Sequence, residues 1–228
     1  MNARRQRVMG MAVVAGLVLT AGTSLAEITG SKHDFSLTAW STNSYGTNAA
    51  ARKEICRPCH VPHKALSTTI PLWNHTASTN TTYTLYSSAT FNATNTLGQP
   101  SGVSKACLAC HDGSTALDSY GGQTGSQTIP VAAKVGAGGN LTKDHPIAFE
   151  YTAALATADG ELYNPTTQSS GIGAEIDDDM LFDNGSGSKT RMECASCHDV
   201  HNTKSAANSK MLLKANNSSA LCLTCHDK

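Results

Sequence analysis

The chain has 228 residues, and its 17 Lys and Arg balance its 17 Asp and Glu, so the formal net charge is zero. This balance excludes the strongly basic surface with which proteins bind nucleic acid. Only 5% of the residues are aromatic, whereas Ser, Thr, Asn and Gly are abundant. Such a composition predicts a loop-rich chain with a thin hydrophobic core, which needs another source of apolar surface.

The N-terminal segment, residues 1–26, has the three parts of a secretory signal peptide. Three arginines lie among the first seven residues, an apolar stretch runs from 8 to 21, and Ser24-Leu25-Ala26 matches a signal-peptidase site. A membrane anchor is the alternative, but a spanning helix needs about 20 apolar residues. We therefore expect export, cleavage after Ala26 and no later membrane span, with 14 Lys and Arg left against 17 Asp and Glu.

Four segments of the remaining chain read Cys-x-x-Cys-His, and together they use all eight cysteines. Two thiols one helical turn apart can add to the two vinyl groups of a porphyrin, and the adjacent histidine can then bind the iron. Zinc sites and disulfides also use paired cysteines, but neither explains a histidine after every pair. The pattern predicts four covalently bound haem c groups, each on a short helical turn. The four segments are Cys56/Cys59/His60, Cys107/Cys110/His111, Cys194/Cys197/His198 and Cys222/Cys225/His226.

Five further histidines are candidates for the second axial ligand of each iron. Four irons need at most four more ligands, so every haem can be bis-histidine with one histidine to spare. An enzyme would need an iron with an open position, so this count favours electron transfer over catalysis. We expect the methionines beyond the signal, Met180, Met192 and Met211, to serve in packing. The five candidates are His33, His63, His75, His145 and His201.

The chain contains an internal repeat. CRPCHVPH at 56–63 corresponds to CASCHDVH at 194–201, and CLACHD at 107–112 corresponds to CLTCHD at 222–227. The repeat predicts two dihaem units within one tetrahaem domain, residues 27–228. The units cover about 48–122 and about 189–228, and a connector covers about 123–188. Because the second unit is so short, its two haems must lie close together, which favours fast electron exchange.

The repeat also suggests a ligand scheme. A histidine three residues after a proximal histidine cannot easily turn back to the same iron, so it should reach the next haem. We therefore expect His63 to serve the haem at Cys107/Cys110 and His201 the haem at Cys222/Cys225. His145 would then serve the haem at Cys194/Cys197, and His75 or His33 the haem at Cys56/Cys59.

Several segments resemble the doubled-CxxCH multihaem c-type cytochromes, and among these the OmcE-type extracellular tetrahaem cytochromes. The resemblance covers nearly the whole exported chain, and the residues outside the haem motifs make it more specific. It is carried by GSKHDFS at 30–36, CRPCHVPHK at 56–64, PLWNH at 71–75, CLACHDGS at 107–114, YGG at 120–122, DHPI at 144–147, CASCHDVHN at 194–202 and LCLTCHDK at 221–228.

The resemblance implies a protein on the outer cell surface that polymerises into a conductive filament, or nanowire, with stacked haems. Its partners would be further copies of itself, other multihaem cytochromes and external electron acceptors. Subunits of such filaments can share a histidine ligand, and His33 is the natural candidate for donation to a neighbour. The alternatives are a monomeric periplasmic electron shuttle and a multihaem reductase with one open haem.

Composition, motifs and resemblance together predict the fold class. We expect a multihaem cytochrome c, made mostly of loops with short helices wrapped around four stacked haems. Little sheet and no conventional hydrophobic core are expected.

Overall fold

The computed structural model describes residues 28–36, 55–66, 70–201, 203 and 209–228. The expected signal peptide lies outside these residues. Among the residues that the structure describes, none of the helices has both the length and the apolar character that a membrane span needs.

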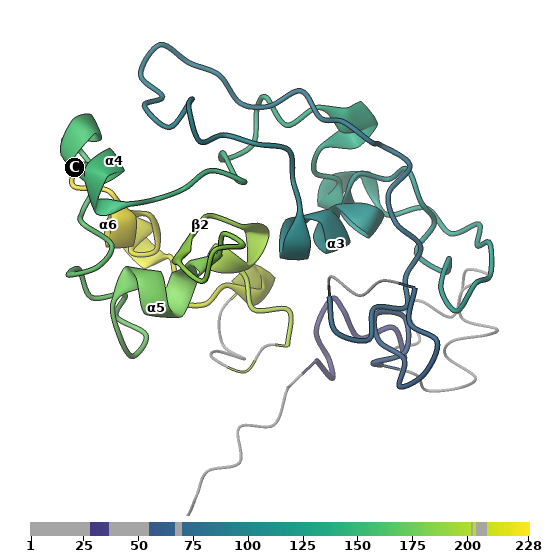
Figure 1. The fold of residues 1–228 in the computed structure, drawn as a ribbon. Helices are drawn as coiled ribbons and strands as arrows, with labels where there is room; N and C mark the ends of the chain where they lie inside the picture. The colour runs from purple at the N-terminus through teal and green to yellow at the C-terminus, as the bar shows by residue number, and fades with distance from the viewer. Residues whose placement is uncertain (1–27, 37–54, 67–69, 202, 204–208) are drawn as a thin grey trace, which may run out of the picture.

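Loops make up most of the described chain, as predicted, and the helices are short. The longest, α3, has 10 residues and ends on the second haem-attachment motif. Figure 1 shows α4, α5, α6 and β2 grouped at one end of the molecule, with α3 nearer the other end. The α-helices are α3 (Gly102–His111), α4 (Ala153–Asp159), α5 (Ile176–Met180) and α6 (Cys222–Cys225). The 3-10 helices are η1 (Val131–Ala133), η2 (Ala137–Gly139), η3 (Cys194–Ser196), η4 (Ser209–Met211) and η5 (Asn217–Ser219).

Two very short strands form an antiparallel pair. Strand β1 (Phe182–Asp183) pairs with β2 (Lys189–Arg191), with Phe182 opposite Arg191. The Asp183 carboxylate accepts hydrogen bonds from the amides of Gly185 and Gly187, which closes the connecting turn. The pair positions the third attachment motif, because η3 follows β2 after two residues.

Local sequence signals explain where α4 begins and ends. The Thr152 hydroxyl accepts a hydrogen bond from the Leu155 amide at 3.1 Å, which caps the first turn. Gly160 ends the helix with a φ of 77°, in the left-handed region that glycine adopts at little cost.

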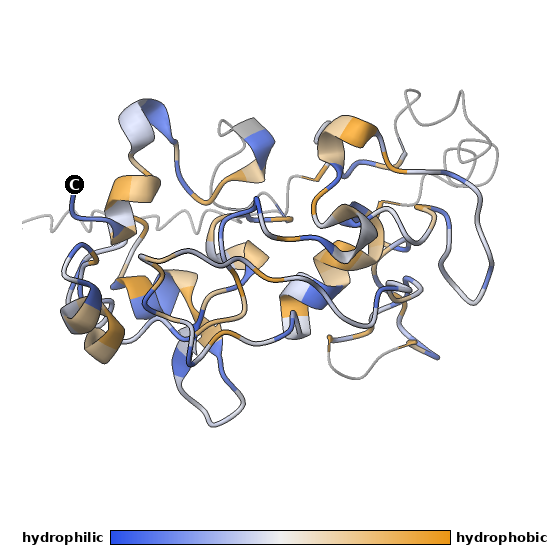
Figure 2. Cartoon of the chain, turned by 90° about the horizontal axis from the view of Figure 1, so that it is seen from above, coloured by the Kyte–Doolittle hydropathy of each residue, from blue (hydrophilic) through white to orange (hydrophobic). Residues whose placement is uncertain are grey.

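Among the described residues, the buried hydrophobic side chains form three separate small clusters and no single continuous core. Figure 2 shows short apolar stretches distributed along the chain. One of the two smaller clusters contains Phe35, Leu117 and Ile129, and the other contains Tyr83, Leu108 and Leu141. The largest cluster contains Ala93, Phe149, Tyr151, Ala156, Ile176, Met180, Leu181, Met192 and Leu221.

The segment predicted to be a connector, about 123–188, is more than a spacer. It contains η1, η2, α4, α5 and β1, and it supplies most of the largest cluster. Met180 and Met192 are buried in that cluster, which confirms their predicted packing role. This cluster lies against the third and fourth motifs, because Cys197 and Cys225 pack on its edge.

Candidate functional site

Each Cys-x-x-Cys-His motif forms one turn that closes on itself. The amides of His60, His198 and His226 each donate a hydrogen bond to the carbonyl of the first cysteine of their motif, at 2.8, 3.2 and 3.1 Å. The remaining motif, the second in chain order, occupies the last turn of α3. The predicted helical turns are confirmed in α3, η3 and α6, whereas the first motif is a hydrogen-bonded turn outside any helix. A turn of this kind presents both thiols and the imidazole together, as covalent haem attachment requires.

All eight cysteines are free thiols, so each sulfur is available for a thioether bond. Cys56 and Cys222 are exposed, and the other six are partly buried. Burial, with a smaller contribution from Cys56, raises the pKa of the Cys59 thiol to about 11. Burial likewise raises the pKa of the Cys225 thiol to about 12. These surroundings favour an uncharged sulfur, and a thioether is uncharged.

Three of the four proximal imidazoles are held by a carbonyl oxygen. The Nδ1–H of His60 donates to Pro71 O at 3.0 Å, that of His111 to Ala133 O at 2.7 Å, and that of His198 to Lys210 O at 3.0 Å. A metal-binding histidine usually donates its other ring N–H to a carbonyl or carboxylate, which fixes the tautomer and the ring orientation. With Nδ1 protonated, the lone pair on Nε2 is free to bind iron.

Three distal candidates each lie beside one proximal histidine. The ring centroids are 6.1 Å apart for His33 and His111, 6.2 Å for His60 and His201, and 6.4 Å for His145 and His226. An imidazole nitrogen binds a metal at about 2 Å, and the ring centroid lies about 1 Å further, so axial imidazoles on one iron have centroids about 6 Å apart. The spacing of all three pairs fits bis-histidine iron.

These pairs differ from the scheme suggested by the repeat. The repeat predicts that His201 serves the haem at Cys222/Cys225, but His201 lies beside His60 of the first motif. The scheme predicts that His145 serves the haem at Cys194/Cys197, but His145 lies beside His226 of the fourth motif. The scheme used only distance along the chain, whereas the paired histidines come from segments at least 78 residues apart.

His33 is half-buried within its own chain. Burial, followed by the nearby His111 and His198, lowers the pKa of His33 to about 4. The imidazole is therefore neutral at physiological pH and keeps a lone pair for a metal.

The remaining two candidates occupy opposite environments. His75 is only 2% exposed, and its Nδ1 and Nε2 lie 2.8 Å from Thr76 O and 3.1 Å from Ala116 O. Its Nε2 also lies 3.3 Å from the sulfur of Cys110. His63, in contrast, is exposed to solvent.

Hydrogen bonds join the second and third attachment motifs. Ser104, which is fully buried in α3, donates its amide to Glu193 Oε2 at 3.1 Å. Its hydroxyl accepts a hydrogen bond from the Cys194 amide at 2.9 Å. The Glu193 carboxylate is itself held by Arg191 Nε at 2.8 Å. Nothing in the sequence pattern singles out Ser104 or Glu193, yet they position two attachment sites side by side.

Asp112 is a third residue that the motif analysis did not single out. It follows the proximal His111 and is only 3% exposed. Its carboxylate accepts hydrogen bonds from the Tyr83 hydroxyl at 2.7 Å, from Asn80 Nδ2 at 2.8 Å and from the Ser78 hydroxyl. The Cys-His-Asp sequence that ends the second, third and fourth motifs is the signal that could have identified it.

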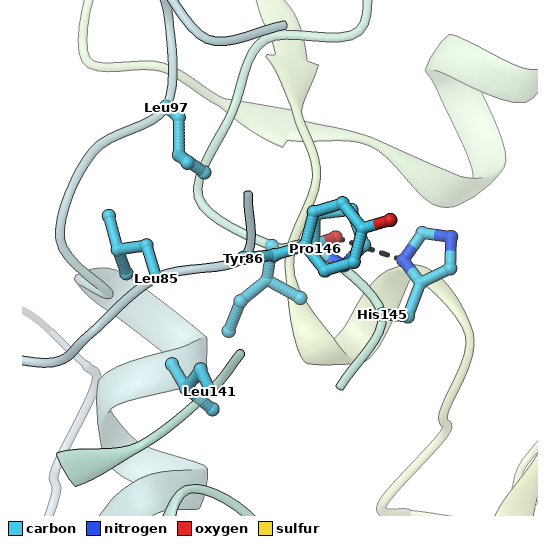
Figure 3. Close-up of a pocket in the computed structure, with 7 residues that line it drawn as sticks. Leu85, Tyr86, Leu97, Leu141, His145 and Pro146 are labelled. Atoms are coloured by element: carbon cyan, nitrogen blue, oxygen red, sulfur yellow. Dashed lines mark hydrogen bonds between the residues drawn. The ribbon is translucent and has the colours of Figure 1, made fainter. Parts of the chain in front are cut away.

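A small apolar pocket lies next to His145. Figure 3 shows the His145 imidazole directed away from the leucines of the pocket, with Nδ1 bonded to Pro146 O at 2.9 Å. This bond again places the proton on Nδ1 and leaves Nε2 for a metal. The pocket is lined by Leu85, Tyr86, Leu97, Leu141, His145, Pro146 and Ile147.

Comparison with known families supports the interpretation of the motifs. The family model of the doubled CXXCH motif matches residues 188–228, which contain the third and fourth motifs. No curated protein matches the chain. The match supports a multihaem c-type cytochrome. In such proteins the CXXCH motifs hold covalently bound haem c, and the haems transfer electrons.

Proposed function

We propose that this chain transfers electrons through four covalently bound haem c groups, each ligated by two histidines. The observation that carries the proposal is the set of three histidine pairs at 6.1–6.4 Å, each joining a motif histidine to a histidine elsewhere in the chain. When bound, haem supplies an iron that changes oxidation state by one electron. The chain's own residues would attach the ring through the cysteines and hold the axial imidazoles in place.

The histidines set the electronic character of the proposed carrier. His60, His111 and His198 are oriented by carbonyl oxygens, so their rings need not rearrange when an electron arrives. Two imidazole ligands give a lower reduction potential than one imidazole and one methionine. Met180 and Met192 are committed to the core, which supports histidine as the second ligand.

We propose that the protein is a carrier and not an enzyme. A reductase needs an iron with a position open to substrate. Three of the four motif histidines already have a histidine partner, and His63 and His75 remain for the fourth. This supply of ligands supports four six-coordinate irons.

We further propose that the protein is exported and forms extracellular filaments that deliver electrons to external acceptors, with a monomeric periplasmic shuttle as the alternative. The support is the N-terminal signal pattern and the sequence resemblance. His33 lies beside His111 of its own chain, so we propose it as a ligand within the chain and not as a donor to a neighbouring subunit. Electron microscopy of natively purified protein distinguishes long threads from discrete particles.

Electron paramagnetic resonance of the oxidised holoprotein tests the carrier function. We expect four low-spin ferric centres that are all reducible and that do not change when cyanide or nitrite is added. A high-spin centre that binds either ligand would instead indicate a reductase.

A further inference from the structure

The two CxxCHxxH segments have the same local structure, although 138 residues separate them. In both, the residue after the proximal histidine donates its amide to a carbonyl on a returning segment. The Val61 amide donates to Leu72 O at 2.8 Å, and the Asp199 amide donates to Met211 O at 2.7 Å. Both acceptor residues have left-handed backbones, with φ of 58° at Leu72 and 55° at Met211.

Two further contacts are repeated in the same order. The second cysteine's carbonyl accepts a hydrogen bond from the returning segment, from Asn74 N at 2.8 Å in one unit and from Leu213 N at 2.9 Å in the other. The proximal imidazoles, His60 and His198, each donate Nδ1–H to a carbonyl of that segment at 3.0 Å. The two segments are therefore equivalent units in structure as well as in sequence.

A histidine of the second CxxCHxxH segment contacts the first segment. His201, three residues after the proximal His198, stacks against His60 with centroids 6.2 Å apart and an interplanar angle of 27°. That spacing suits two axial ligands on the iron carried by Cys56 and Cys59. The trailing histidine of the second unit thus faces the proximal histidine of the first.

We propose that the exchange is reciprocal, and that His63 is the second axial ligand of the iron carried by Cys194 and Cys197, opposite His198. This inference rests on the proposed haem binding. The two segments share their sequence pattern and backbone hydrogen bonds, so His63 follows His60 as His201 follows His198, and the contact from His201 to His60 brings the two segments together. His63 occupies the position in the first unit that His201 occupies in the second.

The environments of His63 and His75 support this assignment. Both ring nitrogens of His75 already face carbonyl oxygens, at 2.8 and 3.1 Å, and the side chain is buried. A ligand needs a ring nitrogen whose lone pair is directed at the metal. His63 is exposed and lies only three residues from His60, so its ring is available to a neighbouring haem.

The reciprocal exchange has a consequence for the electron path. Each short His-x-x-His segment would hold two irons at once, so the first and third haems must be direct neighbours. The two halves of the chain would also be joined twice through metal bonds, which reduces the freedom of the unfolded chain as crosslinks do. Electrons could then pass between the dihaem units without crossing the second or fourth haem.

Single substitutions in the full-length holoprotein give the first test, with covalent haem counted by intact mass and low-spin centres counted by electron paramagnetic resonance. We expect His63→Ala and His201→Ala each to retain four haems but to lose one of the four low-spin signals, and added imidazole to restore it. His75→Ala should retain all four signals. If His75→Ala loses a signal and His63→Ala does not, the assignment is wrong.

Removal of one haem tests which iron each histidine serves. In Cys56→Ala/Cys59→Ala protein, His201→Ala should cause no further loss of low-spin signal, whereas His63→Ala should remove one. In Cys194→Ala/Cys197→Ala protein, the two effects should be exchanged. The opposite pattern would overturn the reciprocal exchange but leave the proposed function intact, whereas absence of haem from the unsubstituted protein would refute the proposed function itself. If the haem-deleted proteins fail to accumulate, the single substitutions decide.

Discussion

Asp112→Ala should destabilise the protein strongly, although Asp112 is not a haem ligand. The carboxylate accepts hydrogen bonds from Ser78, Asn80 and Tyr83 and from the Ser114 amide, and the residue is 3% exposed. Burial alone would raise the pKa of Asp112, but the hydrogen bonds outweigh it and leave the pKa below its ordinary value. The group is therefore ionised, and hydrogen bonds to an ionised group are stronger than neutral ones.

The magnitude follows from the donors that lose their partner. Each hydrogen bond to a charged group contributes about 1.5–3 kcal/mol, and solvent can compensate the more exposed donors, so we expect a loss of about 3–5 kcal/mol. Asp227→Ala is the matched control, because it ends the equivalent Cys-His-Asp segment but accepts one exposed hydrogen bond from Tyr163, at 2.9 Å. That substitution should cost under about 1 kcal/mol.

Urea unfolding of the holoproteins, followed by far-ultraviolet circular dichroism, measures both losses. The reasoning is refuted if the two substitutions shift the free energy of unfolding by similar amounts. An altered haem count by mass in Asp112→Ala protein would also contradict it, because the carboxylate is assigned to the fold and not to haem attachment.

Three further predictions concern the contacts between and around the haem sites. Ser104→Ala should cost about 1–3 kcal/mol in urea unfolding, because the partly buried Cys194 amide loses its acceptor. Ser101→Ala should lower the free energy of unfolding far less, because Ser101 is exposed at the start of α3 and makes no side-chain capping bond. Equal losses for Ser104→Ala and Ser101→Ala would contradict the argument. His145→Ala should convert one low-spin haem to a high-spin centre that binds cyanide, because His145 faces His226 at 6.4 Å, and an unchanged spectrum would refute the pair. Protein with all eight cysteines replaced by alanine should be largely unfolded by circular dichroism and rapidly digested by protease, because the hydrophobic clusters are small. A folded, protease-resistant chain would contradict this prediction.

The local turns of the Cys-x-x-Cys-His motifs and the loop-rich fold could be predicted from the sequence. Cys-x-x-Cys-His fixes a local turn, so the hydrogen bond from His60 N to Cys56 O follows from spacing alone. The low aromatic content correctly indicated many loops and short helices. The connector was underestimated, because Phe149, Tyr151 and Ile176 are separated in sequence and form a core only after the chain folds.

The histidine partners could not be predicted from spacing. The repeat shows that His63 and His201 are equivalent, but it does not show toward which neighbour each segment points. That direction depends on contacts between distant segments, such as the bond from Ser104 to Glu193 that joins α3 to the third motif. Such contacts leave no periodic pattern in the sequence, and only the three-dimensional arrangement identifies them.

Denaturing intact-mass spectrometry of the natively produced protein tests the central claim most directly. Thioether bonds survive denaturation, so we predict the mass of the polypeptide plus four haem groups, one for each Cys-x-x-Cys-His motif. The mass of the bare polypeptide, or one explained by disulfides alone, would contradict the account.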